Sequence, residues 1–223
     1  MRTVIVTAFI CIAAIITGYF MLKPKEKERR LPVINPIDIE EEMVETGMQG
    51  IGYGHKIQSF SFTDQNNRTV TDKEIQGKIW IAEYFFTTCG TICPKMNQQM
   101  MRVQQEFKND NDIKILSFTV DPETDTPEQL KTYASGHEAV ENQWYFLTGK
   151  KEDLYQFARK SIFVLKPAEA ANLGDAGSDF IHTNNFVLID KEGRIRGYYD
   201  GTNNKEVTQL IADIRLLKKE KPD

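Results

Sequence analysis

Two cysteines, Cys89 and Cys93, stand four residues apart in the stretch Thr87-Thr-Cys-Gly-Thr-Ile-Cys-Pro94. Thiols can bind soft metal ions, exchange disulfides or close a structural bridge, and the thiolate is the reactive form. A structural disulfide is the plain alternative, but a bridge across so short a loop constrains the unfolded chain little. The spacing therefore favours a redox-active or metal-binding pair.

The residues on either side of the pair predict a strand-to-helix turn. Residues 79–86 are rich in β-branched and aromatic types, which is typical of a buried strand. Pro94 suits the first turn of a helix, and apolar residues then recur at helical spacing at Met96, Met100, Val103 and Phe107. Cys93 is thus expected at a helix N-terminus, where the positive end of the helix dipole favours a thiolate.

Histidine supplies the candidate for a third metal ligand, and the chain has three: His55, His137 and His182. His182 precedes a predicted strand, and in a thioredoxin-like arrangement the segment entering that strand faces the cysteine turn. Two thiolates and an imidazole fit Cu(I) and are one ligand short of the usual structural zinc site. The alternative is a His182 that binds nothing. His55 is expected to be solvated and His137 to be exposed.

The methionines near the pair are a weaker candidate. Met96, Met100 and Met101 could bind copper through their thioethers, but their spacing is that of a packed helix face. We therefore interpret them as core residues.

The N-terminal part of the chain predicts a membrane anchor and a linker. Residues 3–22 carry no charge, and at 1.5 Å per residue they make a helix of about 30 Å, the thickness of a bilayer core. We expect residues 1–22 to form an uncleaved anchor, with a cleaved signal peptide as the alternative. Residues 23–50 are charged and contain prolines, so they predict a solvated tether before a globular domain at 51–223.

Charge bears on partners and on orientation. The 223-residue chain has a formal net charge of −4 and no basic stripe with interleaved aromatics, so a nucleic-acid partner is not expected. Only Arg2 precedes the apolar segment, whereas five lysines and arginines follow it within residues 23–30. By the positive-inside rule alone, the domain would face the cytoplasm.

The globular part predicts an α/β domain with a mixed sheet flanked by helices. An N-terminal hairpin at 57–70 leads to a short turn that Thr71 and Glu74 close as a capping box. Strands are then expected at 79–86, 113–120, 144–147, 185–189 and 194–199, and helices at 94–107, 127–136, 151–160 and 205–218. Strand–helix alternation implies parallel pairing through right-handed crossovers. The order resembles the thioredoxin fold with an N-terminal hairpin extension and an insertion, residues 166–179, before the final hairpin.

Three motifs together resemble the Sco/SenC family of membrane-anchored copper proteins. They are TTCGTICP, FTVDPETDTPEQL and DFIHTNNFVLIDKEGRIRGYYDG, and the resemblance covers residues 55–218. It implies that Cys89, Cys93 and His182 are copper ligands and that Asp121 lies beside the site. The chain departs from the family in having Ile181 where an aspartate often precedes the histidine, with Asp179 two residues earlier. This departure weakens the expected support of the histidine.

The resemblance also implies a role. Such proteins deliver copper, or the reduced thiols needed to receive it, to the dinuclear copper centre of cytochrome c oxidase. The expected partners are the copper-bearing subunit of the oxidase, an upstream copper donor and the membrane, with copper carried as Cu(I) or Cu(II). The domain is then expected outside the cytoplasm, in the periplasm or its equivalent, against the charge bias. The alternatives are a metal-independent thiol–disulfide oxidoreductase using the same two cysteines, and a redox or copper sensor.

Overall fold

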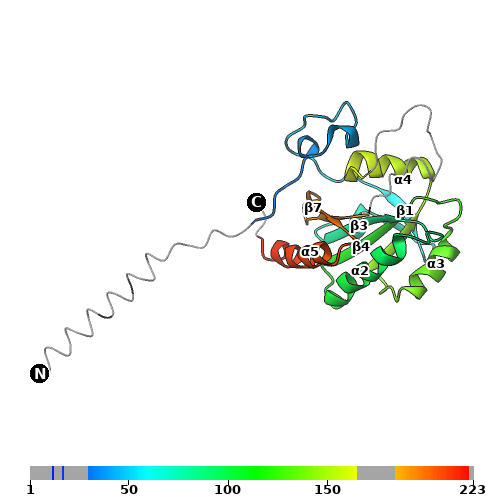
Figure 1. The fold of residues 1–223 in the computed structure, drawn as a ribbon. Coiled ribbons are helices and arrows are strands. Elements are labelled where there is room, and N and C mark those ends of the chain that lie inside the picture. The colour runs from blue at the N-terminus through cyan, green and yellow to red at the C-terminus, as the bar shows by residue number, and fades with distance from the viewer. Residues whose placement is uncertain (1–11, 13–16, 18–29, 165–183, 221–223) are drawn as a thin grey trace, which may run out of the picture.

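The protein folds around one twisted sheet with helices on both faces (Figure 1). The computed structural model describes Ile12, Thr17 and residues 30–164 and 184–220. The strands are β1 Ser61–Asp64, β2 Thr69–Thr71, β3 Ile79–Phe85, β4 Ile113–Thr119, β5 Trp144–Thr148, β6 Asn185–Ile189 and β7 Ile195–Asp200. The α-helices are α2 Cys93–Glu106, α3 Pro127–Gly136, α4 Lys151–Phe157 and α5 Asn204–Leu217. Short 3₁₀ turns are η1 Pro36–Asp38, η2 Glu41–Met43 and η3 Asp72–Glu74, and η4 Ala158–Ile162 is a π-helix.

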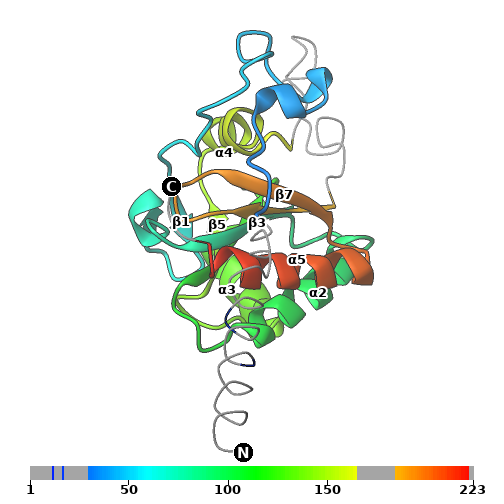
Figure 2. The same ribbon diagram turned by 90° about the vertical axis from the view of Figure 1, so that its left-hand side faces the viewer.

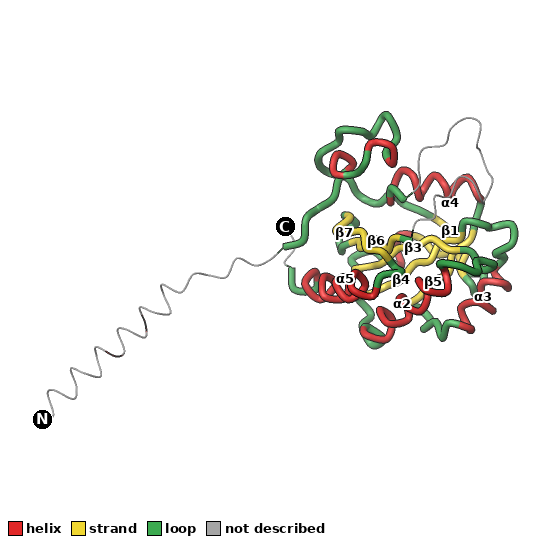
Figure 3. The backbone as a smooth tube through the Cα atoms, viewed as in Figure 1, coloured by secondary structure: helices red, strands yellow, loops and turns green. Residues whose placement is uncertain are grey.

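The sheet is mixed, with strand order β2-β1-β5-β4-β3-β6-β7. Strand β3 pairs in parallel with β4, and β4 in parallel with β5, whereas β1 and β6 join the sheet antiparallel. Figure 3 shows these strands as one layer between helices. This confirms the thioredoxin-like fold, in which the two parallel strands after the first hairpin carry their following loops to one edge of the sheet.

Helix boundaries follow the local signals in the sequence. Thr71 caps η3, with Glu74 completing the predicted capping box, and Thr126 accepts a hydrogen bond from the Gln129 amide at the start of α3. The expected helix at 151–160 is α-helical only to Phe157 and continues as the π-helix η4.

Each face of β3 supplies one of two cores. Trp80, Ala82 and Tyr84 pack with β1 and α4 on one face. Ile79, Ile81 and Phe85 pack with α2, α3 and α5 on the other, as expected for side chains that alternate along a strand. Figure 2 shows α4 on one side of the sheet and the other three helices opposite it. Both cysteines belong to the second core.

The segment before β1 packs against the domain. The Arg196 guanidinium, 4% exposed, donates to the carbonyl oxygens of Leu31 at 2.6 Å and Pro32 at 2.9 Å. Ile34 bridges to Ile195 with an N–H···O distance of 2.8 Å, and Val44 is 1% exposed in the first core. The predicted solvated tether is therefore wrong for residues 31–50, because buried contacts to β7 and the core hold this segment in place.

No helix within the described residues is long and apolar enough to cross a membrane. The predicted anchor at residues 1–22 lies outside the described part of the chain, except for Ile12 and Thr17.

Candidate metal centre

The two cysteines lie where the chain passes from the C-terminal end of β3 into α2. The Cys89 amide donates to the Phe86 carbonyl at 3.2 Å, which closes a tight turn directly after the strand. Cys93 is the first residue of α2, and Pro94 follows it in the first helical turn, as the sequence predicts. Both thiols are free, at 9% exposure for Cys89 and 3% for Cys93. The pair is thus sheltered but reachable from the side of Cys89.

The two thiols differ in acidity. Burial disfavours a thiolate at Cys89, but hydrogen bonds from Cys93 and Thr91 outweigh burial and lower the Cys89 pKa to about 7. Burial and the hydrogen bond to Cys89 raise the pKa of Cys93 to about 12. The first negative charge of the pair therefore resides on Cys89. The expectation that the helix N-terminus makes Cys93 the more acidic thiol is wrong, because deeper burial dominates there.

Asp125 holds the thiol-bearing turn from the neighbouring loop, and the sequence reasoning missed it. This carboxylate is fully buried and accepts hydrogen bonds from the Thr87 hydroxyl at 2.5 Å and the Thr87 amide at 3.2 Å. It also accepts one from the Thr119 hydroxyl at the end of β4. Burial raises its pKa, while the hydrogen bonds from the two threonines oppose that rise. The signal in the sequence is an aspartate beside the predicted helix cap Thr126.

Glu83 is a second buried acid that the sequence reasoning missed. It lies in the middle of β3, fully buried, and accepts a hydrogen bond from the Ser117 hydroxyl at 2.5 Å. Ser117 in turn accepts one from the Trp144 indole at 2.8 Å. Oε2 of Glu83 has no hydrogen-bond partner among the described residues, and burial raises the Glu83 pKa to about 7. The signal was a charged residue inside an apolar strand.

A polar group one turn along α2 from Cys93 joins the site to the surface. Asn97 is 1% exposed, and its Nδ2 donates to the Tyr133 hydroxyl and lies 3.2 Å from His137 Nε2. His137 is half-buried against the Tyr133 ring, so the expectation that it is exposed is wrong. Burial lowers the His137 pKa, which favours the neutral ring.

The other histidine expectation is also corrected. His55 is 8% exposed, and its Nε2 lies 2.8 Å from the Ser161 carbonyl oxygen, with the ring packed on Phe163. It was expected to be solvated because it follows a run of glycines. The packing of the N-terminal segment against η4 buries it instead.

The remaining predicted site residues are placed only in part. Met96 and Met100 are buried in the core, as interpreted, and Met101 packs against it. Asp121 is half-buried and its amide donates to Thr119, so its place beside the copper site stays a prediction. His182, Asp179 and Ile181 lie outside the described residues. Within the described part of the chain, no three cysteine, histidine or acidic residues form a metal-binding group.

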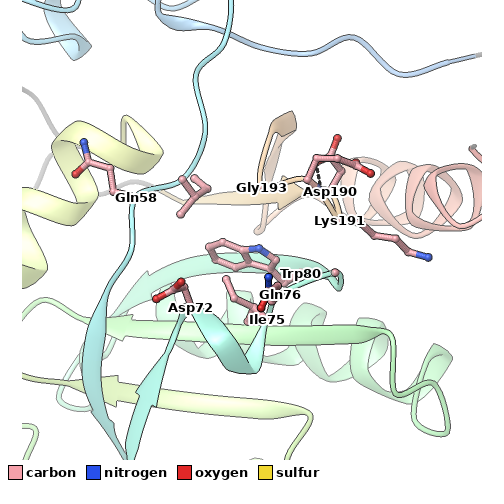
Figure 4. A pocket seen from close by; sticks show the side chains of 11 residues that line it. Gln58, Asp72, Ile75, Gln76, Trp80, Asp190, Lys191 and Gly193 are labelled. Carbon is pink, nitrogen blue, oxygen red and sulfur yellow. Dashed lines mark hydrogen bonds between the residues drawn. The ribbon is translucent and has the colours of Figure 1, made fainter. Parts of the chain in front are cut away.

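A small pocket lies at the opposite end of β3 from the cysteines. Figure 4 shows the Trp80 ring between η3 and the β6–β7 turn, with Asp72 and Lys191 at the rim. Its volume is about 180 Å³. Since Trp80 is the second residue of β3 and Cys89 follows the strand's end, this pocket takes no part in the thiol site.

Comparison with known proteins gives consistent matches. The family model described as SCO1/SenC matches residues 49–218. The "SCO1 protein homolog" of Bacillus subtilis strain 168 is 33% identical over 165 residues, covering 72% of this chain and 82% of the relative. A relative from Stutzerimonas stutzeri whose name describes copper binding is 30% identical, covering 64% and 68%. The solved structure of BsSco, titled for a disulfide switch in a member of the Sco family of cytochrome c oxidase assembly proteins, is 31% identical with a TM-score of 0.63, covering 75% and 95%.

Proposed function

The chain belongs to the SCO1/SenC family, and we propose that it binds copper and delivers it to the dinuclear copper centre of cytochrome c oxidase. The proposed ligands are the thiolates of Cys89 and Cys93 and the imidazole of His182. Copper is here the cargo, passed from an upstream donor to the copper-bearing subunit of the oxidase.

The observation that carries this proposal is the pair of free, sheltered thiols at the end of β3. Thiolates select soft ions such as Cu(I), and ligands must lose their protons before they bind. Cys89, with a pKa of about 7, is half ionised at neutral pH, so binding begins there and need displace only the Cys93 proton. The names of the S. stutzeri relative and of BsSco support copper binding and oxidase assembly as the direction of the chemistry.

A second candidate function, thiol–disulfide exchange, is favoured by the unequal acidity of the pair. A thiol with a pKa near ambient pH is close to the optimum for attack on a disulfide. Cys93, with its pKa raised to about 12, would stay protonated until the mixed disulfide forms. This activity could reduce the target's cysteines before copper arrives, and the two roles are compatible because the disulfide form offers no thiolates to copper.

Location is part of the proposal. We infer that residues 1–22 anchor the protein in a membrane and that the domain lies on the non-cytoplasmic side. The support is the uncharged stretch 3–22 and the thiol chemistry, set against five basic residues in 23–30. Protease added to cells with a permeabilised outer layer should digest the domain. Complete protection behind an intact inner membrane would place the domain in the cytoplasm.

Copper titration of the reduced full-length protein tests the ligand set. We expect one tightly bound Cu(I) per chain, with tight binding lost in Cys89→Ser and in Cys93→Ser because one thiolate leaves an incomplete soft site. Cys11→Ser is the matched control, since it removes the remaining thiol of the chain outside the domain. Unchanged affinity in either of the first two variants refutes copper binding by the pair.

His182→Ala separates the two candidate functions. Copper delivery predicts that this variant loses Cu(II) more than Cu(I), because the harder ion depends more on imidazole, and that oxidase assembly fails in cells. Thiol exchange predicts that the variant keeps both its exchange rate and its support of the oxidase, because exchange requires only a thiolate and access. Normal oxidase assembly with copper binding lost would leave exchange as the function.

A further inference from the structure

Asp125 links two loops that the fold brings together at the C-terminal ends of β3 and β4. Its carboxylate receives the Thr87 hydroxyl at 2.5 Å, the Thr87 amide at 3.3 and 3.2 Å, and the Thr119 hydroxyl. Asp125 is itself held by its own amide, which donates to the Asp121 carbonyl at 2.8 Å. Hydrogen bonds to a carboxylate are about twice as strong as neutral ones, and here they are buried.

These contacts control the position of one cysteine and not the other. Thr87 is two residues before Cys89, so the backbone that carries this thiol begins from a point fixed by Asp125. Cys93 is placed independently, as the first residue of α2 packed in the second core. The separation of the two sulfurs therefore depends on where the turn 87–92 is held relative to α2.

The structure shows which state of the pair this arrangement suits. Both cysteines are free thiols while all the Asp125 contacts are formed, and the Cys93 thiol donates a hydrogen bond to the Cys89 sulfur. Hydrogen-bonded sulfurs stand well beyond the S–S bond length of about 2.05 Å. Closing the disulfide draws Cys89 toward α2 and away from Asp125, so the lost contacts count against the oxidised form.

We propose that Asp125 is a positioning residue that, through Thr87, holds Cys89 apart from Cys93 and favours the dithiol over the disulfide. The inference rests on the proposed function in that the dithiol is the form able to receive copper. Asp125 thus keeps the pair ready for metal in surroundings that would otherwise oxidise it.

The equilibrium that Asp125 controls is a thiol–disulfide exchange. The Cys89 thiolate attacks one sulfur of glutathione disulfide and releases a glutathione thiolate, giving a mixed disulfide. Cys93 loses its proton to the released thiolate or to buffer and attacks Cys89, which frees the second glutathione. The two cysteine thiols lose two electrons and two protons, and glutathione disulfide becomes two glutathione thiols.

The test measures this equilibrium in the full-length protein carrying Cys11→Ser, so that only the pair is counted. The variants are equilibrated in glutathione buffers, and alkylation with mass analysis gives the disulfide fraction. We expect Asp125→Ala to shift the equilibrium about tenfold toward the disulfide, which is about 30 mV for two electrons. Thr87→Val, which removes the hydroxyl alone, should shift it less, and Thr87→Ser should restore the wild-type value.

Coupling and a matched control distinguish positioning from general destabilisation. The double variant should shift the equilibrium no more than Asp125→Ala alone, because both changes remove one interaction. Asp64→Ala is the control, since Asp64 is equally buried and accepts the amides of Asn66 and Arg68 at the remote β1–β2 turn. It should leave the equilibrium unchanged. If Asp125→Ala does not fold, Thr87→Val decides.

The proposal is overturned if neither Asp125→Ala nor Thr87→Val moves the equilibrium by more than twofold, or if Asp64→Ala moves it equally. Its failure is distinct from failure of the proposed function. Wild-type protein that binds no copper, with the expected shifts in the variants, leaves Asp125 as a positioning residue for thiol exchange. Wild-type protein that binds copper, with no shift in the variants, removes the role of Asp125 alone.

Discussion

Replacing Glu83 by glutamine should abolish a pH dependence of stability that the wild-type protein carries in its core. Glu83 is fully buried in β3, and its one hydrogen-bond donor is Ser117. Burial raises its pKa from 4.5 to about 7. The folded state thus holds a proton on Glu83 at pH values where the unfolded chain has released it.

The sign and size follow from linkage. A raised pKa in the folded state means that the free energy of unfolding is greatest below pH 4.5 and falls as the pH rises toward 7. The two values differ by 7 − 4.5 = 2.5, and at about 1.36 kcal/mol per unit the full effect is about 3 kcal/mol. Between about pH 5 and about pH 8, we expect the wild type to lose about 2 to 3 kcal/mol that Glu83→Gln retains.

Denaturant unfolding of the reduced protein across this range is the assay. The amide of Gln keeps an oxygen for Ser117 but buries an N–H without a partner, which costs about 1–3 kcal/mol at every pH. The difference between the two pH profiles is therefore the quantity to measure. Cys89 also titrates near pH 7, but it is present in both proteins and cancels in the difference. Glu123→Gln, an exposed acid in the loop after β4, is the control. Parallel wild-type and Glu83→Gln profiles would refute a protonated Glu83 in the core.

Three further outcomes are expected. Alkylation of the reduced protein should be faster at Cys89 than at Cys93, with the rate at Cys89 half-maximal near pH 7; equal rates at the two thiols would contradict the assigned acidities. Burial lowers the pKa of His55, so the free energy of unfolding should fall as the pH drops below about 6.5, and His55→Gln should flatten this fall in the same denaturant assay. Arg196→Met should cost about 3 kcal/mol or more, because it leaves buried acids without their cation, and should speed hydrogen exchange at the Ile34 amide; protection of that amide at the wild-type level would argue against the clamp.

Local sequence signals predicted the elements that present the thiols. The apolar run of β3 and the Met96–Met100 face of α2 lie within the segments they define, and Thr71 and Thr126 cap turns that begin beside them. These features depend on neighbours a few residues away, so pattern and propensity suffice. Family resemblance added the function and the third ligand, which spacing alone could not assign.

The supporting residues could not be predicted in the same way, because each depends on a partner distant in the sequence. Asp125 meets Thr87 across 38 residues, and Arg196 meets Leu31 across 165. The acidity of the thiols also escaped prediction. The helix dipole at Cys93 is a local effect visible in the sequence, whereas the burial that outweighs it arises from packing against the whole second core.

The clamp at Arg196 also determines how far the domain can travel. A free linker of residues 23–50 has 28 residues and could extend to about 100 Å, but one that ends where Leu31 is clamped has 8 residues and extends to about 30 Å. For a chain held in a membrane through residues 3–22, as we propose, the accessible volume falls about 40-fold with the cube of this ratio, and the local concentration of the domain at a membrane-bound partner rises accordingly. The clamp lies beside Ile79 at the start of β3 and the thiols lie beyond its end, about 20 Å away along the strand. The short leash therefore restricts the search of the domain to partners whose docking surface lies close to the bilayer.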